Sequence, residues 1–138
     1  LHKWLIQCSF EVYSMAWDLS HIAKQVEEQA VEHAQDIALE MYREINELSP
    51  VKTSRYVSNW YIAVGYTPER YDGDRKIGRD LAYFDNGRDE VLAMKKLDSI
   101  WMLNETPYGG DLELGNSRQA PEGVVRVVFP AVARKHGY

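Results

Sequence analysis

Histidine and carboxylate side chains could bind a metal or transfer protons if their spacing brought them together. Four histidines are spread along the chain, at His2, His21, His33 and His136. No two of them stand three or four residues apart, the spacing at which a helix brings two ligands to one metal. Asp72 and Asp74 flank Gly73, but the twelve-residue pattern of a calcium loop is absent around them. The sequence therefore predicts no metal site.

Motifs for covalent catalysis and for binding cofactor phosphates are absent from the sequence as well. There is no Gly-x-Ser-x-Gly motif for a nucleophilic serine, and no Walker or Gly-x-Gly-x-x-Gly pattern for a nucleotide. The pair Gly109-Gly110 is too short to surround a phosphate. We therefore expect no catalytic residue and no cofactor, and we expect that the protein is not an enzyme.

A row of carboxylates recurs at every fourth position: Glu28, Glu32, Asp36, Glu40 and Glu44. On a helix this row would follow one face, and its like-charged pairs would oppose helix formation by about 1–2 kcal/mol before screening by salt. A face that is simply exposed to water would tolerate this cost. Alternatively, the row repels the phosphates of DNA in a channel, or it pairs with basic residues of a neighbouring copy. The C-terminal segment offers such basic residues at Arg118, Arg126, Arg134 and Lys135.

A second cluster combines aromatic and basic side chains, namely Lys52, Arg55, Tyr56, Trp60, Tyr61 and Tyr66. Aromatic rings stack on bases in proteins that bind single-stranded nucleic acids, and basic residues can contact the phosphates. Packing in a core or an interface is the favoured interpretation, because alternation along a predicted strand buries Trp60. The formal net charge of −5 also argues against a general nucleic-acid-binding protein.

The length and composition fit one folded domain that covers residues 1–138. Hydrophobic residues make up 45% of the chain, a share that excludes a disordered protein. No apolar run approaches the roughly 18 residues that a membrane-spanning helix needs. We therefore expect a folded domain that does not enter a membrane.

The element that must position the carboxylate row is a long helix at about residues 19–48. Apolar residues recur there at steps of three and four: Leu19, Ile22, Val26, Ala30, Ala34, Ile37, Met41, Ile45 and Leu48. Pro50 ends the helix, because a proline disfavours helical geometry at the preceding residue. Such a helix is about 45 Å long, whereas a domain of this size has a radius of gyration of about 14–15 Å. We therefore expect part of the helix to pack against another subunit.

The rest of the chain predicts, in order, a strand at about 56–65, a loop or arm at 66–80, a short helix at about 86–97, a strand at about 99–104 and a C-terminal element at about 121–135. In the first strand, alternation buries Trp60, Ile62 and Val64 on one face. The following loop is long and polar, carries Arg70 and Arg75, and is typical of an arm that contacts a partner.

The last two elements carry apolar residues with little alternation. The strand at about 99–104 contains Ile100-Trp101-Met102-Leu103, which is apolar on both faces and so predicts a central strand. The C-terminal element fits a helix that starts near Ala120-Pro121, and its run of valines fits a strand equally well. Pro130 would interrupt either structure, and a helix is the favoured interpretation.

Two ordered blocks of sequence carry a family resemblance. The first reads Ser49-Pro50-Val51-Lys52-Thr53-Ser54-Arg55-Tyr56, then Asn59-Trp60 and Val64-Gly65. The second reads Pro107-Tyr108, then Leu112-Glu113-Leu114-Gly115, then Gln119-Ala120-Pro121-Glu122-Gly123-Val124-Val125-Arg126. Together they resemble the neck, or tail-completion, proteins of tailed bacteriophages, whose pattern is roughly TPVDTGR, NW and VG, followed by PYA, LE, G, QAP and GMVR. The resemblance extends from about Trp17 to Arg134.

Several positions depart from the family pattern. Ser49 stands at its threonine, Lys52 at its aspartate, Ser54 at its turn glycine and Val124 at its methionine. Leu114 also replaces the usual aromatic residue that follows the glutamate. We expect Ser54 to adopt helical or β geometry, in which a serine replaces glycine without strain.

The resemblance implies a non-enzymatic component of the virion, assembled in the cytoplasm of the host bacterium. Hexameric or dodecameric rings of such proteins join the head's portal and adaptor to the tail, and they enclose the passing double-stranded DNA without reading its sequence. The neighbours would be a head-to-tail adaptor, a tail terminator or tail-tube proteins. The implied fold is α+β, with a long helix packed on a small, mainly antiparallel sheet or sandwich and short helices in the middle and at the C-terminus.

The charge pattern and the resemblance together predict the interface residues. They are Glu28, Glu32, Asp36, Glu40, Arg55, Trp60, Arg70, Arg75, Tyr108, Glu113, Arg118, Gln119 and Arg126. The first block would shape the corner between the helix and the first strand, and the second would lie near subunit contacts. Two other functions remain open at this point: a tail-tube terminator or another tail component, and a small nucleic-acid-binding module.

Overall fold

The computed structural model describes residues 19–52, 54–115 and 117–138, so Cys8 and Thr53 lie outside the described residues. The fold is α+β, as predicted, but its sheet has two strands and there is no second sheet to form a sandwich among these residues. The elements are α2 (Ser20–Leu48), α3 (Arg55–Ser58), β1 (Trp60–Val64), α4 (Gly78–Asp85), α5 (Arg88–Leu92), β2 (Ile100–Asn104), α6 (Gly109–Glu113) and α7 (Val125–Lys135).

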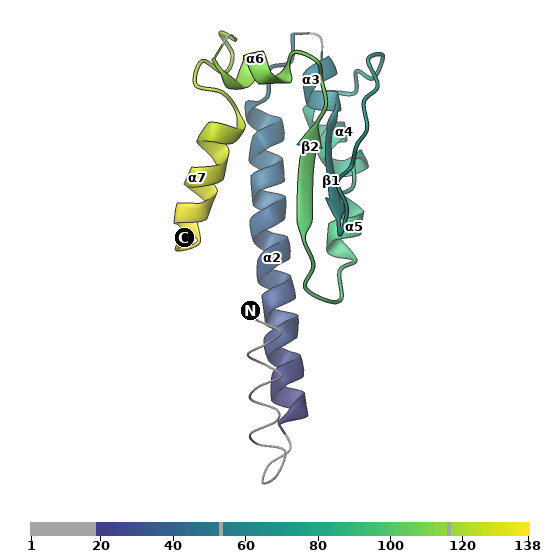
Figure 1. Ribbon diagram of the computed structural model, residues 1–138, viewed down its shortest axis with the longest axis vertical. Helices are drawn as coiled ribbons and strands as arrows, with labels where there is room; N and C mark the ends of the chain where they lie inside the picture. The colour runs from purple at the N-terminus through teal and green to yellow at the C-terminus, as the bar shows by residue number, and fades with distance from the viewer. Residues whose placement is uncertain (1–18, 53, 116) are drawn as a thin grey trace.

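Helix α2 is the central axis of the molecule, and its bounds agree with the predicted helix to within one residue (Figure 1). Helix α7 lies along one side of it, and the sheet with α4 and α5 lies on the other. The helix ends as predicted before Pro50, where Ser49 adopts an extended conformation. The Ile45 carbonyl oxygen accepts from both the Ser49 N–H, at 3.0 Å, and the Ser49 hydroxyl, at 2.6 Å, so Ser49 closes the last turn of the helix.

Tyr42 ties α2 to the elements on the sheet side of the molecule. Its ring is fully buried, and its hydroxyl lies 2.8 Å from the Trp60 carbonyl oxygen and 3.1 Å from that of Ala82. Burial raises the pKa of the Tyr42 hydroxyl well above its usual value, so the group remains a hydrogen-bond donor at neutral pH. A buried donor shared between β1 and α4 fixes the distance between these two elements.

The two strands form an antiparallel pair in which Trp60 lies opposite Asn104 and Val64 lies opposite Ile100. The predicted burial of one face of the first strand is incomplete, because Tyr61 and Ala63 on the other face are buried too. Residues 56–58, assigned to the strand from sequence, form the helical turn α3 instead.

The prediction of a central second strand is wrong. Strand β2 lies at the edge of the sheet, and the side chain of Trp101 is 47% exposed. An apolar run predicts burial on both faces, but it does not reveal how many strands are available to cover it. In this chain β1 is the single neighbouring strand among the described residues.

The segment predicted as a loop or arm at 66–80 is anchored to the rest of the chain. The Asn59 side-chain amide donates to the Asp72 carbonyl oxygen and accepts from the Asp72 N–H, at 2.9 and 2.8 Å. Arg55 Nε donates to the Gly73 carbonyl oxygen at 2.8 Å. The loop ends at Ile77, because residues 78–80 belong to α4, where the Arg79 guanidinium donates to the Ser49 carbonyl oxygen at 2.9 Å.

The helix predicted at 86–97 is also wrong in its bounds, since two short helices, α4 and α5, meet at Asn86-Gly87. Asn86 is buried rather than exposed at a helix start, and its side-chain amide donates to the Ser58 and Trp60 carbonyl oxygens at 2.9 and 2.8 Å. These bonds hold Asn86 against β1 and so interrupt the helix there.

The C-terminal element is a helix, which agrees with the favoured interpretation, but it starts at Val125 rather than near residue 121. Val128 and Val132 are buried against α2 and the core. Pro130 lies inside the helix and removes one backbone hydrogen bond. Packing of the buried valines therefore stabilises α7 more than its own hydrogen-bond ladder does.

Candidate interaction site

The two sequence blocks fold against each other at the corner between α2 and β1. The Val51 N–H donates to Gln119 Oε1 at 2.9 Å, and the Asn104 side-chain amide donates to the Tyr56 carbonyl oxygen at 2.8 Å. Gln119 therefore has a structural partner inside its own chain. Residues that are far apart in the sequence form one continuous structure here.

Ser54 occupies the position at which the family pattern has a turn glycine, and the structure explains that preference. Its φ of 58° lies in the left-handed region, and no other non-glycine residue among those described has a positive φ. The expectation of helical or β geometry at Ser54 is therefore wrong. The chain has to reverse between Pro50 and α3, and this reversal needs a left-handed residue.

Trp60 supports the corner from the inside of the protomer. Its side chain is 5% exposed, and its indole N–H donates to Ser49 Oγ at 3.1 Å. The Tyr56 ring packs against it edge to face, with 5.8 Å between ring centroids. Burial, and then the charge of Glu113, raise the pKa of the Tyr56 hydroxyl. Trp60 was predicted at an interface, but as a core residue it can act on a partner only through the shape of the corner.

A cleft of about 500 Å³ opens where the two blocks meet. It is lined by Pro50, Lys52, Arg55, Tyr56, Tyr108, Leu112, Ser117, Arg118 and Gln119. Three of these side chains are cationic and none is a carboxylate, so the lining has a positive formal charge. Two tyrosine rings and a leucine provide apolar surface beside the cations. Four of the predicted interface residues, Arg55, Tyr108, Arg118 and Gln119, thus share one surface.

Glu113 binds the first turn of α7 in its own chain. Its Oε1 accepts from the N–H groups of Val124 and Val125, each at 3.0 Å, and its Oε2 accepts from that of Arg126 at 3.4 Å. The Arg126 guanidinium in turn donates to the Glu113 carbonyl oxygen at 3.2 Å. A carboxylate at a helix N-terminus satisfies free N–H groups and interacts favourably with the helix dipole.

Two glycines of the second block allow the loop before α7 to close on itself. Gly115 and Gly123 both have φ near +90°. A Cβ atom on Gly115 would lie 2.4 Å from the Pro121 carbonyl oxygen, and one on Gly123 would lie 2.6 Å from that of Glu113. Any side chain at either position would push the backbone apart, so the spacing of Glu113, Gly115 and Gly123 follows from this close contact.

The carboxylate row of α2 is divided between a contact within the chain and a surface exposed to solvent. Glu40 lies beside α7, where it forms an ion pair with Lys135, and His136 Nε2 lies 2.6 Å from Glu40 Oε2. The lysine, followed by the histidine, lowers the pKa of the Glu40 carboxyl. At Glu40, the basic residue that one interpretation assigned to a neighbouring copy is supplied by the same chain.

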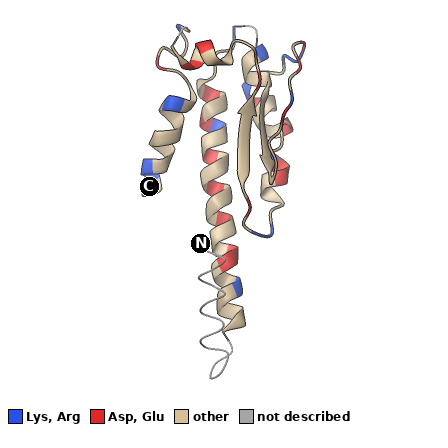
Figure 2. Ribbon diagram, viewed as in Figure 1, with Lys and Arg blue, Asp and Glu red and all other residues tan. Residues whose placement is uncertain are grey.

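The remaining predicted carboxylates of the row, Glu28, Glu32 and Asp36, are exposed. Figure 2 shows acidic residues along α2 and basic residues on α7. Glu28 lies 4.0 Å from Lys24 one turn earlier, a distance typical of weak surface pairs. This part of the row is available to a partner, and whether it meets one stays a prediction.

Arg70 and Arg75 differ in what they contact. Arg75 is half-buried, and its guanidinium donates to Asn86 Oδ1 at 2.8 Å, so it holds the loop in place. Arg70 is exposed and lies over the Tyr61 ring, 5.2 Å from the ring centroid. Of the two, Arg70 is the side chain that a partner can reach.

The sequence reasoning missed an exposed group of aromatic and cationic residues on α4 and α5. Leu81 and Phe84 are more than half exposed, and the Arg88 guanidinium lies 5.1 Å from the Phe84 ring centroid and 5.6 Å from that of Tyr83. The spacing of Leu81 and Phe84 by three residues within one helix was the available signal. It was hidden because residues 78–80 were assigned to a loop.

Other classes of site are missing from the part of the chain that the structure covers. Within residues 19–52, 54–115 and 117–138, no three His, Cys, Asp or Glu side chains are grouped as a metal site would require. None of the helices in these ranges has the length and hydrophobicity needed to span a bilayer. Comparisons with protein-family models, with curated proteins and with solved structures found no match.

Proposed function

We propose that this protein is a structural subunit of a phage neck, and that copies of it form a ring that joins the head to the tail. In this proposal the subunit acts by shape and by surface contacts and performs no chemistry. The ring would be hexameric or dodecameric, and it would contact a head-to-tail adaptor on one side and tail terminator or tail-tube proteins on the other.

The observation that carries the proposal is the uncovered first third of α2. Residues 20–30 include no buried side chain, and Val31 is the first buried residue of the helix. Ile22 and Val26 continue the apolar stripe, yet they are 44% and 41% exposed. Most helices in proteins gain their stability from packing of the apolar face, and this part of α2 receives none from the other described elements. A neighbouring subunit would supply that packing.

The corner between α2 and β1 is a second observation that supports the same proposal. The blocks that carry the family resemblance build one cleft, and their glycines and glutamate form the loop before α7. The resemblance therefore rests on residues that act together in the fold. This makes the matched pattern more informative than a set of scattered identities.

The cationic cleft is also the observation that favours a second candidate, a small nucleic-acid-binding module. Lys52, Arg55 and Arg118 could contact phosphates, and the tyrosine rings beside them could stack on bases. The formal net charge of −5 opposes this reading. Binding of a single-stranded oligonucleotide that weakens steeply with added salt would favour the module over the neck subunit.

The test is the phenotype of a phage that lacks the protein. We expect lysates without it to contain DNA-filled heads and finished tails that are not joined, and we expect the purified protein to restore joining when it is added. Tails of irregular length would favour a tail terminator instead. Normal joined particles in the absence of the protein would contradict both assignments.

A further inference from the structure

We propose that the open edge of β2 pairs with β2 of a second copy, in antiparallel orientation about Trp101, to form a four-stranded sheet across two protomers. The inference goes beyond the proposed ring, because it names a surface and a partner that the ring itself does not require. It depends on the direction of backbone groups in β2, on the exposed Trp101 and on the charges that flank the strand.

The register of the sheet shows which backbone groups of β2 face outward. The Gly65 N–H donates to the Ser99 carbonyl oxygen at 2.8 Å, so the backbone N–H and C=O groups of Ser99 point toward β1. The direction of these groups alternates along an antiparallel strand, so the backbone groups of Trp101 and Leu103 point toward β1 as well. The N–H and C=O groups of Ile100 and Met102 point away from β1, and they have no hydrogen-bond partner among the described residues.

The other edge of the sheet is closed by the protomer itself. The Ile62 N–H donates to the Asn86 carbonyl oxygen at 3.0 Å, and the Val64 N–H donates to Glu90 Oε1 at 3.2 Å. These contacts satisfy the outward N–H groups of Ile62 and Val64. The sheet thus has one protected edge and one open edge, and the open edge carries the sequence Ile-Trp-Met-Leu-Asn.

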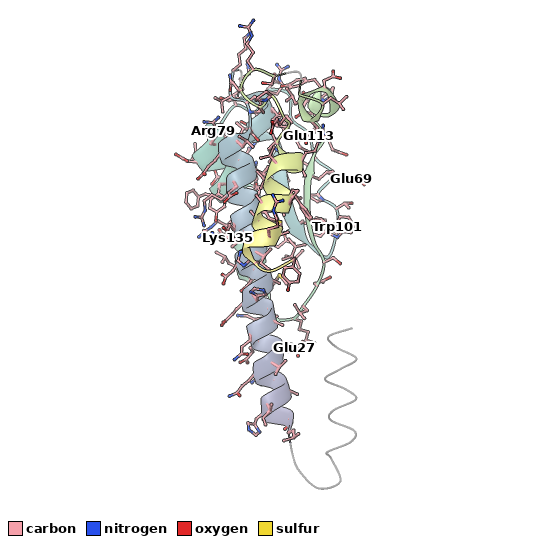
Figure 3. The ribbon with its side chains drawn as sticks, turned by 90° about the vertical axis from the view of Figure 1, so that its left-hand side faces the viewer. Glu27, Glu69, Arg79, Trp101, Glu113 and Lys135 are labelled. Atoms are coloured by element: carbon pink, nitrogen blue, oxygen red, sulfur yellow. The ribbon has the colours of Figure 1, made fainter. Side chains whose placement is uncertain are left out.

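Strand β2 lacks three features by which proteins protect an open edge. It contains no proline and no charged residue, and its register with β1 has no bulge. Its outward side chain Trp101 is 47% exposed, and Figure 3 shows it pointing away from α2 and α7. The unpaired backbone N–H and C=O groups and the exposed indole therefore lie on the same strand.

A second copy fits this edge because the edge is complementary to itself. With Trp101 opposite Trp101, each Ile100 would exchange two backbone hydrogen bonds with Met102 of the other copy. The two indoles would then lie on the same face as a directly opposed cross-strand pair, the arrangement in which aromatic side chains contact each other.

The charges on either side of β2 agree with the same antiparallel pairing. Lys95, Lys96 and Asp98 precede the strand with a net formal charge of +1, Glu105 follows it, and all four are exposed. The pairing about Trp101 would place the lysines of one copy at the end of the sheet where Glu105 of the other copy lies, and the twofold symmetry repeats this contact. A parallel pairing would bring like charges together, so the charges favour the antiparallel one.

The test compares two substitutions at Met102 in the full chain, by sedimentation velocity over a range of concentrations. Met102→Pro removes the outward N–H without removing a bond to β1, and proline is tolerated where a strand's N–H faces solvent. Met102→Ala shortens the same side chain but keeps the N–H. We expect Met102→Pro to weaken dimerisation about tenfold or more relative to Met102→Ala.

A third variant tests the register without changing the backbone. Trp101→Lys would place two lysines opposite each other at the centre of the pairing, and we expect it to abolish the dimer while far-UV circular dichroism stays unchanged. A wild-type protein that is monomeric at all concentrations would overturn the inference. An unchanged dimer in both Met102→Pro and Trp101→Lys would overturn it too.

The outcomes also separate this inference from the proposed function. Because the β2 pairing has twofold symmetry, it describes a dimer of the free protein that is separate from the head-to-tail contacts of a ring with two different sides. A Met102→Pro protein that associates as the wild type does and still joins heads to tails would overturn the β2 pairing and leave the neck assignment standing. A protein that forms the β2 dimer but never joins heads to tails would overturn the neck assignment and leave the β2 pairing standing.

Discussion

At the scale of single residues, the corner between α2 and β1 is built by side chains that bind backbone groups. Ser49 and Asn59 satisfy carbonyl or N–H groups of neighbouring turns, and Glu113 does the same for α7. Each of these positions has one geometric task in the fold. A partner that contacts this corner would depend on its shape, which these hydrogen bonds maintain, and would not touch the bonds themselves.

Ser54→Gly should stabilise the protein. A serine in the left-handed region carries a steric cost of about 1–2 kcal/mol, which glycine avoids, while glycine loses more backbone entropy on folding. We expect a net gain of about 0.5–1 kcal/mol in the free energy of unfolding, measured by urea titration. Ser54→Ala is the matched control and should bring no gain. An equal midpoint for Ser54→Gly and Ser54→Ala would contradict the left-handed geometry.

Glu113→Ala should destabilise the fold through α7. The substitution leaves the N–H groups of Val124 and Val125 without their acceptor, and the loss of such a cap costs about 1–2 kcal/mol. Glu122→Ala removes a nearby exposed carboxylate and serves as the control. Urea titration should show a lower midpoint for Glu113→Ala alone, and a shift of similar size in both variants would argue against the cap.

At the scale of elements, the sequence predicted the long helix and the strand at 100–104 well, because both have local signals. An apolar stripe and a proline mark the helix, and a short apolar run marks the strand. The division at Asn86-Gly87 was not predictable in this way. It depends on hydrogen bonds that the Asn86 side-chain amide donates to residues almost thirty positions earlier. The edge position of β2 was hidden for a similar reason, since local periodicity shows what a strand could bury and not what is available to cover it. The cleft depends likewise on bonds such as that from Val51 to Gln119, between distant parts of the chain.

The contact of α7 with α2 should weaken in acid. The pKa of Glu40 is lowered in the folded protein, so its ionised form stabilises the fold at pH values above the unfolded pKa of about 4.5. That contribution is lost as the pH falls through the folded pKa. We expect faster amide hydrogen exchange in α7 at pH 3 than at pH 6, relative to α2 and after correction for intrinsic rates. Glu40→Gln should reduce this difference, and an unchanged difference would show that other groups cause it.

At the scale of the whole molecule, the structure combines a firmly packed half with a protruding helix. The core lies around α2 from Val31 onward, whereas residues 20–30 extend beyond the sheet and α7 (Figure 1). In the proposed function, the apolar end of this helix would be an assembly contact. The exposed carboxylates Glu28, Glu32 and Asp36 lie along the adjoining part of the helix.

Charge reversal of Glu32 and Asp36 together should weaken assembly more than it weakens folding. Both side chains are exposed, so Glu32→Lys with Asp36→Lys should leave the urea midpoint of the subunit nearly unchanged. If the carboxylates face a neighbouring copy, the double variant should need a higher protein concentration to assemble. The paired control is Asp74→Lys in the exposed loop, and ring formation equal to wild type in both proteins would discard this use of the row.

The most direct test of the proposed function is the mass of the purified protein measured by native mass spectrometry across a range of concentrations. The neck assignment predicts a closed assembly of six or twelve copies of the 16.0 kDa chain. A mass of one chain at every protein concentration, with or without added phage heads and tails, would contradict it.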